Sequence, residues 1–275
     1  MGLWVRLLNL ILEMASVWPR VREGSLLEGV APGPDGKIGV LTIFPHQDDE
    51  SIYSAGTLLK LKKDPRVRLC LLNLTRGEKS PSHLRLGISP EQMGRIRDRE
   101  LLSVASVLGA EEVIQLDYSD LGLEGADPSE LRQRVAEAIT RAGAQIIITF
   151  DPFGFYGHPD HRVANRVAME AFKQSRAQRL YYVSLPKWQA RMRVILCDFS
   201  MGMKWYLPLV YHYLTRTTPV PPTLRIDIRA EKKLKRLALD QYASQKYHSN
   251  LTAFLEMSVV SNYEWFALAA ENPGS

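Results

Sequence analysis

Short apolar runs alternate with amphipathic segments along most of the 275-residue chain, and this alternation most constrains its fold. Continuous apolar runs are typical of parallel strands that are buried on both faces. The amphipathic segments between them have helical period and would cover those faces. The sequence therefore predicts an α/β protein, a Rossmann-like three-layer sandwich with a mainly parallel sheet.

The predicted elements follow one another with short connections. Strands are expected at residues 38–45, 67–75, 112–118, 144–150, 179–186 and 223–228. Helices are expected at residues 51–63, 90–109, 127–143, 158–174 and 230–245, while residues 261–270 are left open as a terminal strand or helix. Gly109 and Asp127 are the expected C-cap and N-cap of two of these helices.

Two parts of the chain depart from this alternation. Residues 1–36 are predicted to form an N-terminal amphipathic helix and a turn-rich linker, and residues 37–275 to form a single domain. Within that domain, residues 187–222 are rich in aromatic side chains and end in a proline cluster. They are predicted to form a lid or an oligomer-interface insertion, so a second copy of the chain is one expected partner.

The amphipathic helix predicted within residues 1–20 has two interpretations. Charged side chains at Arg6 and Glu13 interrupt its apolar stretch, which makes it a poor signal peptide and a poor transmembrane helix. It would pack on the domain or in an oligomer interface, or it would contact a membrane surface peripherally.

Charge and cysteine content limit the partners and the compartment. The formal net charge is +5, but the basic residues are scattered and no nucleic-acid-binding motif is present, so no nucleic acid is expected as a partner. An anionic substrate or membrane surface would suit this charge. The two cysteines, Cys70 and Cys197, form no disulfide framework, and a cytoplasmic location, at most peripheral at the membrane, is expected.

Two motifs rich in histidine and aspartate follow predicted strands. PHQDDE occupies residues 45–50 after the strand at 38–45, and HPDH occupies residues 158–161 beyond the strand at 144–150. Parallel α/β sheets bind their ligands at the carboxyl ends of the strands. Both motifs are therefore expected to open on the same rim, where they bring together three of the six histidines.

These residue types suit zinc catalysis, which uses three protein ligands and an open position for water. His46 and one of Asp48 and Asp49 would supply two ligands. His158 and His161 would supply one ligand and one catalytic group. The second aspartate would then accept a proton from metal-bound water. The alternative is structural, because adjacent aspartates also cap helices and an aspartate in a first helical turn is favoured by the helix dipole.

With these motifs the sequence resembles the LmbE-like or PIG-L family of zinc-dependent N-acetylglucosaminyl deacetylases. That family shows P/A-H-P-D-D-E after its first strand and H-P-D-H about a hundred residues later. Shorter similarities are TRGE at 75–78, RDRE at 97–100, LDYSD at 116–120 and ALDQYASQ at 238–245. The resemblance covers about residues 37–247. One departure is Gln47, which stands where the family usually has a proline.

The resemblance implies a role for each matching residue. The implied ligands of one Zn²⁺ per chain are His46, Asp49 and His161. The implied catalytic residues are Asp48 as general base, His158 to polarise the amide oxygen or protonate the leaving amine, Asp160 to orient His158 and keep it cationic, and Tyr156 to assist the tetrahedral intermediate. The implied substrate-binding residues are Arg97 and Asp120.

The resemblance also implies a reaction. The chain would be a zinc-dependent hydrolase that removes the N-acetyl group from a glycoconjugate containing N-acetylglucosamine and releases acetate. One alternative is an amidase of the same fold with a non-sugar N-acyl substrate. Another is a non-catalytic carbohydrate-binding protein.

Overall fold

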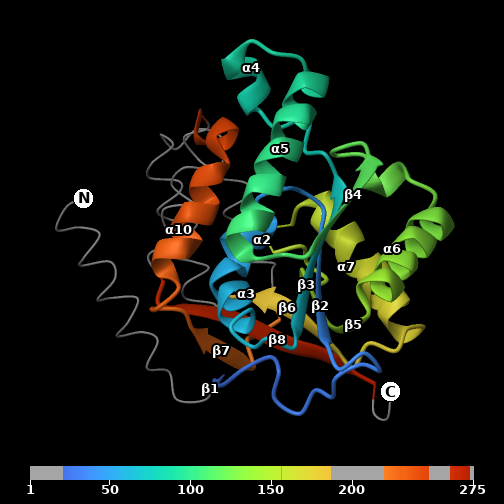
Figure 1. Cartoon of the computed structure of the whole chain (residues 1–275). Helices are drawn as coiled ribbons and strands as arrows, with labels where there is room; N and C mark the ends of the chain where they lie inside the picture. Colours follow the sequence, from blue (N-terminus) through green and yellow to red (C-terminus); the bar gives the residue numbers. More distant parts are fainter. Residues whose placement is uncertain (1–20, 156, 187–219, 248–260, 273–275) are drawn as a thin grey trace.

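One eight-stranded sheet forms the centre of the computed structural model, which describes residues 21–155, 157–186, 220–247 and 261–272 (Figure 1). The strands are β1 (Arg22–Glu23), β2 (Ile38–Phe44), β3 (Val67–Thr75), β4 (Glu112–Tyr118), β5 (Ala144–Thr149), β6 (Arg179–Ser184), β7 (Leu224–Asp227) and β8 (Tyr263–Glu271). Their order across the sheet is β1-β7-β8-β6-β5-β2-β3-β4. Only β8 among them runs antiparallel to its neighbours, so the prediction of a mainly parallel sheet is confirmed.

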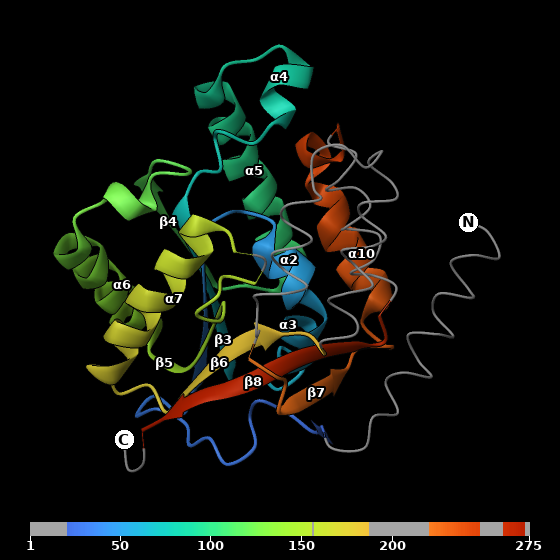
Figure 2. The same cartoon turned by 180° about the vertical axis from the view of Figure 1, so that it is seen from behind.

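Helices cover both faces of the sheet. The α-helices are α2 (Asp49–Tyr53), α3 (Ala55–Leu61), α4 (Ser82–Leu86), α5 (Pro90–Leu108), α6 (Pro128–Ala142), α7 (Pro159–Lys173) and α10 (Lys232–Gln241). Two short 3-10 helices, η1 (Leu123–Gly125) and η2 (Ala243–Tyr247), complete the described elements. Figures 1 and 2 show α6 and α7 together on one side of the sheet and α2, α3, α5 and α10 on the other.

The side chains of β2 alternate between two apolar cores, because successive residues of a strand point to opposite faces. Val40 and Phe44 belong to the core under α2, α3, α5 and α10. Leu41 and Ile43 belong to the core under α6 and α7. All seven residues of β2 are buried. This two-sided burial explains why the strand appears in the sequence as a continuous apolar run.

The single helix predicted at residues 51–63 is wrong, since the chain forms α2 and α3 with a break at Ser54. In a continuous helix the Gly56 N–H would bond to the Ile52 carbonyl. Instead Gly56 N donates to the Glu264 carboxylate at 2.9 Å, and the Ile52 carbonyl accepts from Lys235 Nζ at 3.0 Å. Lys235 and Glu264 also pair with each other at 2.7 Å. A buried ion pair from α10 and β8 therefore replaces this helical hydrogen bond.

Residues before the expected boundary at residue 37 also contact the sheet and its core. β1 pairs in parallel with β7, and Leu26 and Val30 are buried in the core that α5 and α10 cover. The helix predicted within residues 1–20 and nearly all of the predicted lid, residues 187–219, lie outside the described residues.

Other predicted elements are confirmed. The terminal segment left open is the strand β8, and Gly109 ends α5 in the left-handed conformation. Asp127 caps α6 by accepting from the N–H groups of Ser129 and Glu130. Within the described parts of the chain, no helix has the length and apolar character needed to cross a membrane.

We predict that Glu264→Ala destabilises the protein by about 3–5 kcal/mol, because it leaves Lys235 charged and buried without its carboxylate. The control is Glu271→Ala, also on β8, whose carboxylate is about half-exposed and pairs with Arg179. Loss of such an exposed pair costs at most about 1 kcal/mol. Urea unfolding of the three proteins measures both changes. Equal midpoints for the two variants would contradict a dominant role of the buried pair.

Candidate active site

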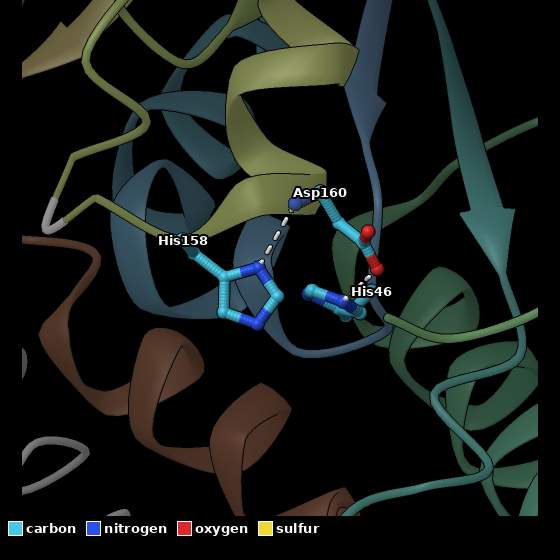
Figure 3. A group of neighbouring side chains, drawn as sticks. All are labelled: His46, His158 and Asp160. Carbon is cyan, nitrogen blue, oxygen red and sulfur yellow. Dashed lines mark hydrogen bonds and ion pairs between the residues drawn. The ribbon is translucent and has the colours of Figure 1, made fainter. Parts of the chain in front are cut away.

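The two histidine motifs meet at the carboxyl ends of β2 and β5, which are direct parallel neighbours. His46 lies just beyond β2, and His158 is the N-cap of α7, whose first residue is Pro159. Figure 3 shows the side chains of His46, His158 and Asp160 converging in front of α7. The expectation that both motifs open on one rim is confirmed.

Asp49 lies between two histidines. Its Oδ2 atom is 3.5 Å from His46 Nδ1, and its Oδ1 atom is 3.7 Å from His161 Nε2. The three residues each offer a ligand atom, and these atoms all lie within 4.8 Å of one another. The ring of His161 stacks on Phe150 at a centroid distance of 3.8 Å, which fixes its orientation. Two imidazole nitrogens and one carboxylate are a donor set typical of catalytic zinc.

A second group of possible ligands consists of His46, His158 and Asp160. Here the carboxylate is already bound, because its Oδ2 accepts from Leu121 N at 2.7 Å and its Oδ1 from Leu123 N at 3.3 Å. Asp160 is buried, and its Oδ2 also lies 3.4 Å from His46 Nε2. Asp49 accepts from the His46 backbone N–H through Oδ2 at 3.1 Å, whereas both oxygens of Asp160 accept such bonds, so the group of His46, Asp49 and His161 fits a metal ion better.

The charges around this site favour a cation. Burial alone would lower the pKa of His46, but contacts with Asp120, Asp160 and Asp49 raise it well above its ordinary value. Burial, together with the charges of His46 and His158, lowers the pKa of His161 well below its ordinary value. Neutral imidazole is the form that binds metals. A divalent cation would take the place of the proton that the surrounding carboxylates hold on His46.

Asp48 is the buried carboxylate next to the candidate ligands. Burial raises its pKa to about 8, the charge of Arg97 opposes this, and the charges of Asp49 and Glu50 add to it. A carboxylate with a pKa near the working pH suits proton transfer. Its backbone is unusual for a non-glycine residue, with φ at 97° in the left-handed region.

His158 differs from the cationic residue that we expected. Burial and the charge of His46 lower the pKa of His158 to about 4. Its Nδ1 atom accepts from the backbone N–H of Asp160 at 3.2 Å, while the Asp160 carboxylate faces His46 and Leu121. Because Nδ1 is an acceptor, a neutral His158 ring carries its proton on Nε2.

Arg97 and Asp120 were predicted to bind substrate, and they contact the expected base and a candidate metal ligand, respectively. Arg97 is buried, and one of its guanidinium nitrogens lies 3.3 Å from Asp48 Oδ2. Asp120 Oδ1 lies 3.1 Å from His46 Nε2. Burial would raise the pKa of Asp120, but the hydrogen bond and charge of His46 and the charge of Arg97 hold it at about 2. Glu78 supports Asp120 by accepting its N–H at 2.8 Å.

The side chain of Gln47, whose partners the sequence left undecided, is buried in the protein. Its amide nitrogen donates to Asp98 Oδ1 on α5 at 3.3 Å and to Gln115 Oε1 on β4 at 3.1 Å. Gln115 in turn donates to the Thr75 carbonyl at 2.7 Å. Gln47 therefore attaches the loop of the first motif to α5 and β4.

Two residues near the site had no predicted role there. Glu50 was interpreted as a helix start, but its buried carboxylate accepts from Tyr242 Oη at 2.8 Å. The ALDQYASQ segment that carries Tyr242 was noted in the sequence as a similarity without a function.

Tyr156, expected to assist the intermediate, lies outside the described residues.

Fold and site together define a class: an α/β protein with a cluster of histidine and aspartate suited to a divalent metal at the carboxyl rim of its sheet. Residues 41–172 match the model of the PIG-L family, described as GlcNAc-PI de-N-acetylase. The matched segment contains both motifs and all the described candidate ligands. This part of the chain is similar to that family.

A curated relative and two solved structures show how far the similarity extends. The chain is 34% identical over 136 residues to a probable N-acetyl-alpha-D-glucosaminyl L-malate deacetylase 2 of Bacillus anthracis. That match spans 48% of this chain and 58% of the relative. N,N'-diacetylchitobiose deacetylase from Pyrococcus horikoshii has the same fold, with a TM-score of 0.58 and 19% identity over 98% of this chain and 94% of that one.

The fold is also shared with a protein of a different printed activity. GalB of Pseudomonas putida, a 4-carboxy-2-hydroxymuconate hydratase, superposes with a TM-score of 0.59 and 16% identity. The superposition covers 87% of this chain and 98% of GalB. The fold alone therefore does not define the reaction, and the argument for function depends on the site.

We predict that His161→Ala removes most of the zinc that the purified protein binds, because it deletes one of the three candidate ligands. His83→Ala is the control, since His83 lies on α4 and bonds to the Ser80 carbonyl. Metal analysis of the purified proteins measures zinc per chain. Unchanged zinc in His161→Ala would remove this residue from the ligand set.

Proposed function

We propose that this protein is a zinc-dependent hydrolase that removes the N-acetyl group from a glycoconjugate containing N-acetylglucosamine and releases acetate. The observation that carries the proposal is the buried carboxylate of Asp48 beside the group of His46, Asp49 and His161. Metal hydrolases need such a pair of functions, a ligand set and a nearby proton acceptor. The match of residues 41–172 to the PIG-L family model and the similarity to a deacetylase relative support the amide as the bond that is cleaved.

The proposed ligands are His46, Asp49 and His161. When bound there, zinc would polarise the acetyl carbonyl and lower the pKa of a water molecule. Asp48 accepts the proton of the attacking water, and the burial that raises its pKa makes its ionised carboxylate a stronger base than a carboxylate in water.

His158 serves the other side of the reaction. With its proton on Nε2, it donates a hydrogen bond to the developing oxyanion or to the leaving nitrogen. As the C–N bond breaks, the nitrogen takes up the proton that Asp48 accepted from the water, which gives acetate and the free amine. The backbone N–H of Asp160 holds the ring in that tautomer. Tyr156, two residues before His158 in the sequence, is proposed to assist the same intermediate.

A non-sugar N-acyl substrate is the second candidate. The candidate ligands and the proposed base define the type of reaction better than they define the substrate. Only the groups around the site distinguish an amino sugar from a simple amide.

The purified zinc-loaded protein is predicted to release acetate from N-acetylglucosamine glycosides. The measurement is acetate release across a panel that contains such glycosides with anionic, sugar and lipid aglycones, together with N-acetyl amino acids and simple N-acetyl amides. Release from the amino acids or simple amides but not from any glycoside would favour the second candidate. No release from any substrate by zinc-loaded protein would contradict the proposed activity.

Asp48→Asn is predicted to bind zinc normally and to lower kcat by about 10²- to 10⁴-fold, because asparagine cannot accept the water proton. Asparagine tolerates the left-handed backbone of this position. The control is Asp117→Asn, whose carboxylate is exposed and pairs with Arg134. Loss of zinc from Asp48→Asn would instead make Asp48 a ligand.

A further inference from the structure

The peptide group between Gln47 and Asp48 is held at both of its polar ends. Its carbonyl, which belongs to Gln47, accepts a hydrogen bond from the Arg97 guanidinium. Its N–H, which belongs to Asp48, donates to Glu50 Oε2 at 3.3 Å. One peptide plane immediately before the proposed base is therefore fixed by two side chains of opposite charge.

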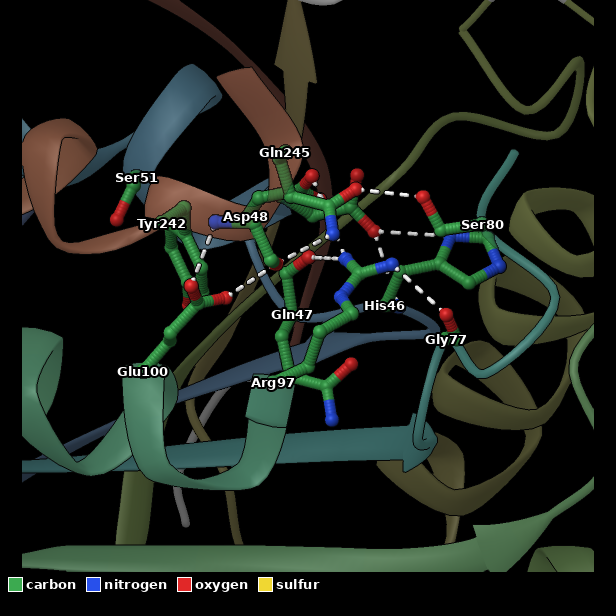
Figure 4. A network of polar contacts seen from close by, with 12 residues as sticks. His46, Gln47, Asp48, Ser51, Gly77, Ser80, Arg97, Glu100, Tyr242 and Gln245 are labelled. Carbon is green, nitrogen blue, oxygen red and sulfur yellow. Dashed lines mark hydrogen bonds and ion pairs between the residues drawn. The ribbon is translucent and has the colours of Figure 1, made fainter. Parts of the chain in front are cut away.

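Arg97 holds this peptide from α5. Besides the Gln47 carbonyl it donates to the carbonyl of Gly77 at 3.0 Å, and it pairs with the Asp48 carboxylate at 3.3 Å (Figure 4). Gly77 has a positive φ of 56°, and a Cβ atom there would collide with the guanidinium. The guanidinium is thus seated between two loops, and its planar fork suits this multiple contact better than an ammonium group would.

Glu50 accepts the N–H of this peptide group. The position of the Glu50 side chain is in turn fixed by a residue almost two hundred positions later in the sequence. The Glu50 Oε1 atom accepts from Tyr242 Oη at 2.8 Å and from Ser51 Oγ at 2.7 Å. Tyr242 follows the last residue of α10 and has no exposed surface. Figure 4 shows Arg97 on α5 and Tyr242 beyond the end of α10, both near the Asp48 loop.

The conformation held by these contacts is a strained one. Asp48 has φ at 97°, a region that non-glycine residues rarely occupy and that persists where the surroundings determine it. In this conformation the Asp48 carboxylate lies near Arg97, next to the His46 and Asp49 group. An extended backbone at this position would direct the side chain elsewhere.

We propose that Arg97, Glu50 and Tyr242 form a positioning clamp, which holds the 47–48 peptide so that the Asp48 carboxylate points at the reacting water. The proposal rests on the proposed function of Asp48 as general base. It assigns Arg97 to the catalytic geometry and not to substrate binding, and it gives the tyrosine of the ALDQYASQ segment a role in turnover.

The first test is Tyr242→Phe, which removes only the hydroxyl group from the clamp. We expect kcat to fall by about tenfold, since small misplacements of catalytic groups have effects of this order or larger, while KM and zinc content stay unchanged. The matched control is Tyr181→Phe on β6, which removes the hydroxyl of another buried tyrosine, one that contacts Arg179. Its kcat should equal that of the wild type.

The second test is Arg97→Lys, which keeps the positive charge but cannot hold two carbonyls and a carboxylate in one plane. We expect kcat to fall further than in Tyr242→Phe, with KM within about twofold of the wild-type value. A raised KM with unchanged kcat would make Arg97 a substrate ligand and would overturn its place in the clamp.

Crystal structures of both variants test the clamp without turnover. We expect Asp48 to leave the positive-φ region, or its carboxylate to turn away from its wild-type position, in Arg97→Lys. An unchanged Asp48 together with unchanged kcat in both variants would overturn the proposal. Failure of the wild-type protein to release acetate would instead contradict the proposed function, and the clamp would then be decided by the conformation of Asp48 in these structures.

Discussion

The direct parallel pairing of β2 with β5 is the constraint on which the site depends. About a hundred residues separate the two motifs in the sequence, yet each lies just beyond one of these adjacent strands. Both strands are almost completely buried between two helical layers, so the register between them is firmly determined. His46 and His161 come within reach of the same carboxylate for this reason.

Burying so many ionisable groups in one place is costly unless each has a partner. The chain distributes those partners by element: Asp120 and Glu78 come from two neighbouring loops, Arg97 comes from α5, and Tyr242 follows α10. Together these contacts keep several carboxylates close to one another beneath the surface. The polar network around the site is as much a part of the structure as either apolar core.

The local sequence was sufficient to predict those elements whose bounds depend on neighbouring residues alone. The strand at residues 67–75 was predicted with the bounds that the structure has, because an apolar run ended by turns defines a buried strand. The half-buried edge strand at residues 112–118 was also predicted with its bounds. Prediction from local sequence failed where a residue's hydrogen-bond partner lies far away in the sequence. The break at Ser54 depends on Glu264, and the orientation of Gln47 depends on Asp98 and Gln115, residues that no local pattern connects.

The same difference applies within the site. Motifs placed the described candidate ligands at one rim, because residue type and position after a strand determine that much. They did not show that Arg97 is buried against Asp48, nor that the Asp160 carboxylate bonds to the loop at Leu121 and Leu123. Hydrogen bonding between segments decides both, and it depends on the packed structure.

The contact of Asp160 with Leu121 has a consequence for how such a protein diversifies. Asp160 meets the backbone N–H of Leu121, whose side chain is 56% exposed. Because that hydrogen bond involves only main-chain atoms on the Leu121 side, it makes no direct use of the Leu121 side chain. The backbone of Leu121 has a positive φ of 58°, so this position can vary in evolution among residues that tolerate a left-handed backbone while the residues behind it keep their arrangement.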